Sequence, residues 1–128
     1  MKRFLNLLAA VCCIWLAVAC NAPAGKGKLK SVDKAEFAVV LGDSSVVLLD
    51  VRTPQEFAQG HIEGAINIDV KDSLFISNVQ RQVAPGSRVA VYCRSGRRSM
   101  SAAQQMVEKG YDVVNLKGGF LAWEESEK

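Results

Sequence analysis

The residues best suited to chemistry lie together in one short segment. Cys93 follows the apolar run Val89–Tyr92, and the loop after it, Arg94–Arg98, holds three arginines and one glycine. The next residues have the i, i+3, i+4, i+7 spacing of one apolar helix face, carried by Met100, Ala102, Ala103, Met106 and Val107. The segment therefore predicts a strand, a tight loop and a helix, with Cys93 at the end of the strand.

A cysteine in this position is predicted to be a nucleophile. The first N–H groups of a helix and the positive end of its dipole favour an anion, and together with nearby arginines they stabilise a thiolate over a thiol. We expect the backbone N–H groups of residues 94–99 to face the sulfur of Cys93, and Gly96 to let the loop curl without a Cβ clash. Cys93 is the candidate catalytic residue, and the candidate substrate-binding residues are Arg94, Ser95, Gly96, Arg97, Arg98 and Ser99.

The loop also has a simpler interpretation, in which Cys93 is a buried apolar filler and the arginines are solvated surface residues. The coincidence of these features at a strand-to-helix junction favours the active-site interpretation. Arg94, Arg97 and Arg98 cannot all point into a pocket that holds one sulfur atom. At least one of them is expected to project outward to an anionic substrate or to pair with an acidic side chain.

The rest of the chain alternates strand and helix patterns, which is typical of an α/β fold with a mainly parallel sheet. Strands are expected at 46–50, 65–68, 89–92 and 113–116. Helices are expected from Ser31 to near Gly42, from Thr53 to Gly60, within 69–83, after the Cys93 loop up to Lys109, and around Trp123. Thr53, Pro54 and Glu56 have the residue types of a capping box with proline at the first helical position.

Asp50 and Arg52 come at the end of the strand at 46–50, and open α/β sheets bind ligands at the carboxyl ends of their strands. They are therefore candidate rim residues of the same site. The alternative, which we favour, is that they pair with each other or with neighbouring loops. His61 is expected to be a turn residue bonded to the backbone, and Trp123 to belong to the core. No cluster of Cys, His and carboxylate residues has metal-ligand spacing, so neither a metal nor a cofactor is expected.

Four segments, in order, resemble the motifs of single-domain rhodaneses, the thiosulfate-type sulfurtransferases. They are Leu49–Phe57, Gly60–Ile68, Cys93–Arg98 and Leu116–Trp123, and the similarity spans about Ser31 to Glu125. The resemblance implies a three-layer α/β/α sandwich with a mainly parallel sheet. It also implies that the thiolate of Cys93 takes sulfane sulfur from a donor such as thiosulfate, and that a thiol or cyanide removes it from the resulting persulfide.

Three other functions use the same residues. Cysteine phosphatases and arsenate reductases resembling this fold have Cys, five residues and then Arg, whereas here Ser99 takes that position and Arg98 comes one residue early. A non-catalytic binding module usually lacks the cysteine or its basic loop, and this chain has both. A persulfide carrier or thiol-redox protein acting on a partner protein shares the chemistry of Cys93 and differs only in its acceptor.

The N-terminus has the pattern of an export signal, because the basic residues Lys2 and Arg3 precede the apolar run Phe4–Val18. With small residues leading to Cys20, the pattern resembles a bacterial lipoprotein leader, although Ala17 stands where such leaders prefer leucine. This interpretation gives a signal peptide at 1–19, a lipidated Cys20 with a flexible tether at 20–30, and a rhodanese-like domain at 31–128. Cleavage without lipidation, an uncleaved anchor and a cytosolic protein with an apolar N-terminus are the alternatives.

The counts of cysteine and charge limit the partners. Cys12 and Cys13 would leave with the leader, so a lipidated Cys20 would leave Cys93 without an intramolecular disulfide partner. A free thiol in an oxidising compartment is prone to oxidation, so its presence there favours a catalytic role for Cys93. Loss of the two basic leader residues lowers the formal net charge from +3 to +1, which gives no support to a nucleic-acid partner.

These observations predict an exported monomer, facing the periplasm, that reaches the membrane only through its lipid anchor. Its expected partners are a small anionic sulfur donor and an acceptor that is a thiol or a protein.

Overall fold

The computed structural model describes residues 25–125, so the expected signal peptide, Cys20 and the first part of the expected tether lie outside the described residues. Within residues 25–125, no helix is long and apolar enough to cross a membrane. The strands are β1 (Leu29–Val32), β2 (Val47–Asp50), β3 (Ile66–Asn67), β4 (Arg88–Tyr92) and β5 (Asp112–Leu116). The helices are α2 (Lys34–Leu41), α3 (Pro54–Gln59), α4 (Phe75–Gln82), α5 (Arg97–Glu108) and α6 (Gly119–Glu125).

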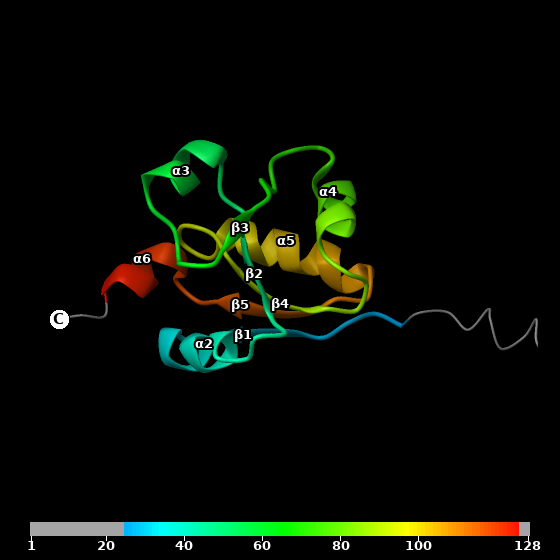
Figure 1. Ribbon diagram of the computed structural model, residues 1–128, viewed down its shortest axis with the longest axis horizontal. Helices are drawn as coiled ribbons and strands as arrows, with labels where there is room; N and C mark the ends of the chain where they lie inside the picture. The colour runs from blue at the N-terminus through cyan, green and yellow to red at the C-terminus, as the bar shows by residue number, and fades with distance from the viewer. Residues whose placement is uncertain (1–24, 126–128) are drawn as a thin grey trace, which may run out of the picture.

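The five strands form one sheet in the order β1-β5-β4-β2-β3, and every neighbouring pair is parallel. Parallel strands all end at the same edge of the sheet, which is the edge where ligands of such folds bind. β4 lies in the middle of the sheet, between β5 and β2. The loop that follows β4, beginning with Cys93, therefore lies at the centre of this edge (Figure 1).

Two apolar clusters cover the two faces of the sheet and make the three expected layers. Val89 and Val91 of β4 pack in the cluster that contains α4 and α5, whereas Ala90 and Tyr92 pack in the cluster that contains α2 and α6 (Figure 1). Because β4 is buried on both faces, its sequence is continuously apolar from Val89 onward. Each fully buried valine contributes roughly 1.5–3 kcal/mol relative to an exposed one. The prediction of an α/β/α sandwich with a mainly parallel sheet is confirmed.

The start of α3 has the expected capping box. The side chain of Thr53 accepts a hydrogen bond from the Glu56 N–H at 3.2 Å, and the Thr53 N–H donates to the Glu56 carboxylate at 3.1 Å. Pro54 is the first helical residue, where its missing N–H costs nothing. The capping box fixes the direction in which the side chain of Glu56 leaves the helix.

Two expected boundaries were wrong. Leu29 and Lys30, expected in the tether, belong to β1, which pairs with β5 through Leu29 and Val113. Ser31 lies in the same strand, so the helix expected from Ser31 starts instead at Lys34. The alternating pattern of β1 is only four residues long and includes a lysine, so its strand conformation depends on pairing with β5.

The helix expected within 69–83 is shorter than its apolar pattern indicates, because α4 starts only at Phe75. Asp69 and Asp72 each accept a hydrogen bond from the N–H two residues later, at 2.9 and 2.8 Å. Such side-chain to backbone bonds favour turns over helix. Leu74, expected as part of the apolar face, is 60 % exposed.

Candidate active site

Cys93 lies in a cradle made by its own loop. Its side chain is only 1 % exposed, and its Sγ accepts a hydrogen bond from the backbone N–H of Gly96 at 3.1 Å. Gly96 has φ +104°, a conformation that favours glycine, and this turn brings its N–H back toward the sulfur. The Ser99 hydroxyl oxygen lies 3.2 Å from the Gly96 carbonyl oxygen, and its single proton can be donated either to that carbonyl or to the thiolate of Cys93. The expected strand, loop and helix around Cys93 are confirmed.

The loop stabilises the thiolate of Cys93. Burial raises the pKa of Cys93, but hydrogen bonds from the Ser99 side chain and from the backbone N–H groups of Ser99, Gly96 and Ser95 lower that pKa below its ordinary value. These donors are the first N–H groups of α5 and of the loop before it. The expected source of activation, amides converging at the start of a helix, is therefore present.

The three arginines of the loop have different surroundings. Arg98 forms a two-pronged ion pair with Glu56 of α3: its Nη1 donates to Oε1 at 2.7 Å and its Nη2 to Oε2 at 2.9 Å. Arg94 and Arg97 are exposed, and neither has an ion-pair partner within the described part of the chain. One arginine thus pairs with an acid, and two project outward.

The start of α6 holds the loop from behind. The N–H of Phe120 donates to the Cys93 carbonyl at 2.8 Å, and the N–H of Leu121 donates to the Arg94 carbonyl at 3.1 Å. Gly119 lies so close to the loop that a Cβ there would be 2.5 Å from the carbonyl oxygens of Cys93 and Arg94. The glycine pair before Phe120 therefore permits a close backbone contact that fixes the loop.

Asp50 and Arg52 pair with each other, as the favoured alternative predicted. Both are buried, and the Arg52 Nη2 lies 2.6 Å from Oδ2 of Asp50 and donates to the Gly60 carbonyl at 2.7 Å. Burial lowers the pKa of Arg52, but its bond to Asp50 raises that pKa above the ordinary value. The Arg52 guanidinium also lies over the ring of Phe120, 4.6 Å from its centroid. This pair therefore ties β2 and the turn after α3 to α6.

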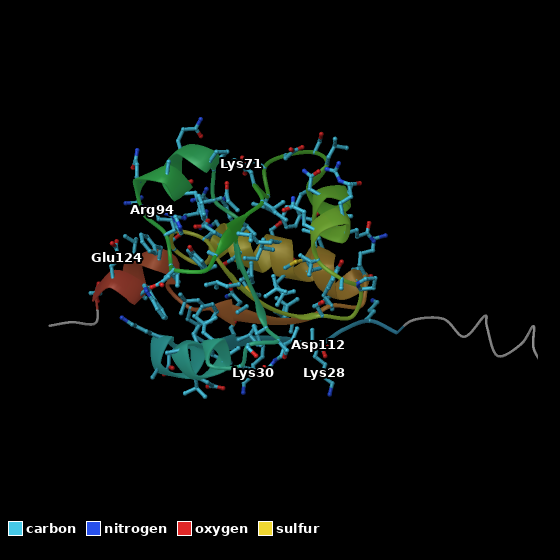
Figure 2. All side chains as sticks on the ribbon, viewed as in Figure 1. Lys28, Lys30, Lys71, Arg94, Asp112 and Glu124 are labelled. Atoms are coloured by element: carbon cyan, nitrogen blue, oxygen red, sulfur yellow. The ribbon has the colours of Figure 1, made fainter. Side chains whose placement is uncertain are left out.

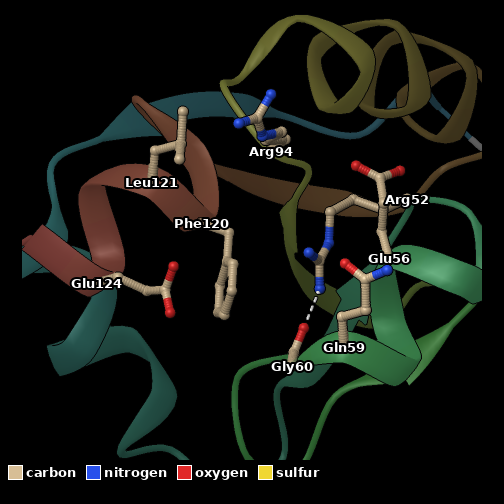
Figure 3. A pocket seen from close by; sticks show the side chains of 8 residues that line it. All are labelled: Arg52, Glu56, Gln59, Gly60, Arg94, Phe120, Leu121 and Glu124. Carbon is tan, nitrogen blue, oxygen red and sulfur yellow. Dashed lines mark hydrogen bonds between the residues drawn. The ribbon is translucent and has the colours of Figure 1, made fainter.

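A cavity of about 260 Å³ lies between α3 and α6, next to the loop. Figure 3 shows Arg52 in its middle, with its bond to Gly60, Phe120 on one side and Gln59 on the other. Arg94 joins the cavity to the loop, whereas Cys93 is not part of the lining. Arg52 is thus a rim residue by position, although its charge is paired, and Asp50 is buried beneath it.

Arg94 and Glu124 lie on the side of the molecule that carries α6, away from Lys28 and Asp112 near the starts of β1 and β5 (Figure 2). No sequence pattern assigns Glu124 or Phe120 to the site. Glu56 is predicted from the sequence only as a helix cap, and no local pattern signals its contact with Arg98.

The contacts of His61 and Trp123 are those of structural residues. His61 Nδ1 lies 2.9 Å from the Phe57 carbonyl, and its ring stacks on that of Phe57 at 3.7 Å. The expected backbone-bonded turn histidine is confirmed. Trp123 is half-buried at the border of the core and packs edge-on against Phe37 of α2, with ring centroids 6.2 Å apart. Within residues 25–125, no group of His, Cys, Asp and Glu has the arrangement of a metal site.

Comparison with known proteins matches the chain to the family model described as Rhodanese-like domain over residues 33–126. A sulfurtransferase of Allochromatium vinosum is 36 % identical over 98 residues, which cover 74 % of this chain and 88 % of that protein. Thiosulfate sulfurtransferase 18 of Arabidopsis thaliana is 38 % identical over 105 residues, which cover 73 % and 76 % of the two chains.

Solved structures agree with the sequence relatives. The crystal structure of a rhodanese-related protein from Thermoplasma volcanium superposes with a TM-score of 0.66 at 26 % identity and covers 77 % of this chain and 93 % of its own. The order of the sheet, the Cys93 loop and the family match lead to one conclusion. The chain belongs to the rhodanese-like family.

Proposed function

We propose that the protein is a sulfurtransferase that carries sulfane sulfur as a persulfide on Cys93, from thiosulfate or a related anionic donor to a thiol or cyanide. The observation that supports this most directly is the bond from the Gly96 N–H to Sγ of Cys93, within a loop whose amides and Ser99 hydroxyl lower the pKa of the thiol. A thiolate is the nucleophilic form of cysteine. The names of the relatives support the same class of reaction.

The reaction has two steps, with Cys93 as the nucleophile in the first and the leaving group in the second. The thiolate attacks the outer sulfur of thiosulfate, the S–S bond of thiosulfate breaks, and sulfite leaves with the electron pair. The acceptor thiolate then attacks the outer sulfur of the persulfide. A new S–S bond forms on the acceptor, and Cys93 returns as a thiolate stabilised by the same N–H groups.

The arrangement of the arginines supports recognition of an anionic donor by Arg94 and Arg97. Both side chains are exposed, and Arg94 also lines the cavity beside the loop. A guanidinium can bind an oxyanion by two parallel hydrogen bonds. We assign Arg94 the first contact with the oxygens of the donor, because Arg94 directly follows Cys93.

The acceptor is a small thiol or the thiol of a partner protein; in the second case the protein acts as a persulfide carrier. We further propose that the mature protein is a monomer attached to a bacterial membrane through Cys20, with the site facing the periplasm.

Mass spectrometry of the purified protein after treatment with thiosulfate tests the reaction class. We expect a gain of one sulfur atom on the peptide that contains Cys93, its loss on addition of cyanide or a thiol, and no gain in Cys93→Ser. If neither thiosulfate nor an inorganic polysulfide adds sulfur to Cys93 in the folded protein, the proposed function is wrong. Cys93-dependent hydrolysis of an aryl phosphate well above background would favour a phosphatase instead.

A further inference from the structure

We propose that Glu56 withholds Arg98 from anions bound at the active loop, so that Arg94 and Arg97 are the arginines left to bind them. Its effect is to weaken the binding of inorganic oxyanions, of which phosphate is a simple probe. The inference rests on the proposed function only in treating the Cys93 loop as the substrate site. Its test measures phosphate binding and needs no sulfur transfer.

The contacts of Glu56 show how completely its carboxylate engages Arg98. Both carboxylate oxygens accept from Arg98, one from each terminal nitrogen. Oε1 also accepts from the Thr53 N–H and hydroxyl, each at 3.1 Å. Both terminal nitrogens of Arg98 are therefore bonded to a carboxylate that is itself anchored by a helix cap. This end of a guanidinium, which carries the two terminal nitrogens, is one of the edges that can bind an oxyanion by two parallel hydrogen bonds.

Arg98 is the last residue of the loop after Cys93, and its charge acts on the thiolate. The pKa of Arg98 is raised first by its bond to Glu56, and the negative charges of Cys93 and Asp69 raise it further, against burial, which lowers it. Arg98 thus lies within electrostatic reach of the thiolate. A guanidinium at this place, released from Glu56, would add a third positive group to a site that already has Arg94 and Arg97.

Glu56 is charged at neutral pH. Its bond to Arg98 lowers its pKa to about 2, so the carboxylate competes with any incoming anion at neutral pH. Both side chains are about one quarter exposed, so water and a small anion have access to the pair. Removal of the carboxylate charge is therefore expected to open Arg98 to anions from solution.

The test is the protection of Cys93 against alkylation by iodoacetamide in the presence of inorganic phosphate. Glu56→Gln keeps the shape of the side chain and removes its charge. We expect the half-protecting phosphate concentration to fall by about threefold to fivefold relative to wild type, the upper part of the range for one exposed charge contact. A merely structural role of Glu56 would loosen the loop and would not strengthen phosphate binding.

Three variants make the result specific. Glu56→Asp keeps the charge and is expected to stay within about twofold of wild type. The double variant Glu56→Gln/Arg98→Gln is expected to lose the gain, because no arginine is released. Glu63→Gln removes an exposed carboxylate from the turn before β3 and is expected to have no effect. Protection that is unchanged or weaker in folded Glu56→Gln overturns the proposal.

A measurement on the wild-type protein gives the answer even if Glu56→Gln does not fold. In NMR spectra of the arginine side chains, saturating phosphate is expected to shift the Nε–H resonances of Arg94 and Arg97 and to leave that of Arg98 in place. A shift of Arg98 as large as that of Arg94 would show that Glu56 does not withhold it. Persulfide formation measured separately by mass spectrometry distinguishes this failure from failure of the proposed function.

Discussion

The backbone N–H of Phe120 donates a hydrogen bond to the carbonyl oxygen of Cys93 at 2.8 Å. The nucleophile is therefore held from two directions, with its sulfur bonded to Gly96 in its own loop and its carbonyl bonded to α6. A backbone carbonyl fixed in this way limits the rotation of the loop around Cys93. The geometry of the cradle thus depends on the close approach of α6 as well as on the loop sequence.

Gly119→Ala should disturb this approach. The added Cβ would lie 2.5 Å from the carbonyl oxygens of Cys93 and Arg94, and Gly119 has φ +58°. Backbone strain at such a φ costs about 1–3 kcal/mol, and the clash with a fixed backbone adds to it. We expect a lower melting temperature and slower alkylation of Cys93.

Gly86→Ala is the matched control for this variant. Gly86 has φ +76°, and a Cβ there would meet no atom within 4 Å. It therefore carries the same kind of backbone strain without the clash. If both variants lose the same stability and Gly119→Ala alkylates at the wild-type rate, the contact between α6 and the loop does not fix the cradle.

Ser99→Ala should raise the pKa of Cys93. The Ser99 hydroxyl is the largest of the groups that lower this pKa, while burial acts in the opposite direction. The rate of alkylation follows the thiolate fraction, so its rise with pH should move to higher pH in the variant. Ser101→Ala, at an exposed position on α5, serves as the control. Coincident pH profiles for Ser99→Ala and wild type would contradict the role of the hydroxyl.

Glu56 should contribute stability that is lost in acid. Its pKa falls from 4.5 to about 2 in the folded protein, chiefly through Arg98. Because the folded pKa is the lower one, the contribution is complete above pH 4.5 and disappears as the pH falls through about 2. The pair is solvent-accessible, so we expect at most about 1 kcal/mol.

Denaturant unfolding of wild type and Glu56→Gln at a series of pH values measures this contribution. The difference in the free energy of unfolding should be constant above pH 4.5 and should shrink as the pH falls toward about 2. A difference that does not change over this range would mean that the cost of the variant does not come from the charge of Glu56.

Cys20→Ser tests the proposed location. Lipidation requires the sulfur of Cys20, so the variant is expected to move from the membrane fraction to the soluble fraction of cells that express the full chain. Cys12→Ser, within the expected leader, is the control and should remain with the membrane. Continued retention of Cys20→Ser in the membrane would favour an uncleaved anchor.

The features that depend on neighbouring residues could be predicted from the sequence. The apolar run before Cys93, the glycine within the loop and the helix pattern after it predicted that N–H groups face the sulfur, because backbone N–H groups at the start of a helix need no distant partner to face an anion. The cap of α3 was equally local, since Thr53 and Glu56 are one helical turn apart.

The surroundings of the loop could not be predicted in this way, because they consist of contacts between segments that are distant in the sequence. Whether Arg98 or another arginine pairs with an acid depends on where α3 lies relative to α5. The residue pattern of neither helix predicts the distance between the two helices. The same holds for β1, whose four residues form a strand by pairing with β5. It also holds for Gly119, whose close contact with Arg94 requires α6 to pack against the sheet. Local residue preferences determine which segments form helices and strands. The free energy of an ion pair or of a close backbone contact depends on distances between segments, and these distances exist only in the folded chain.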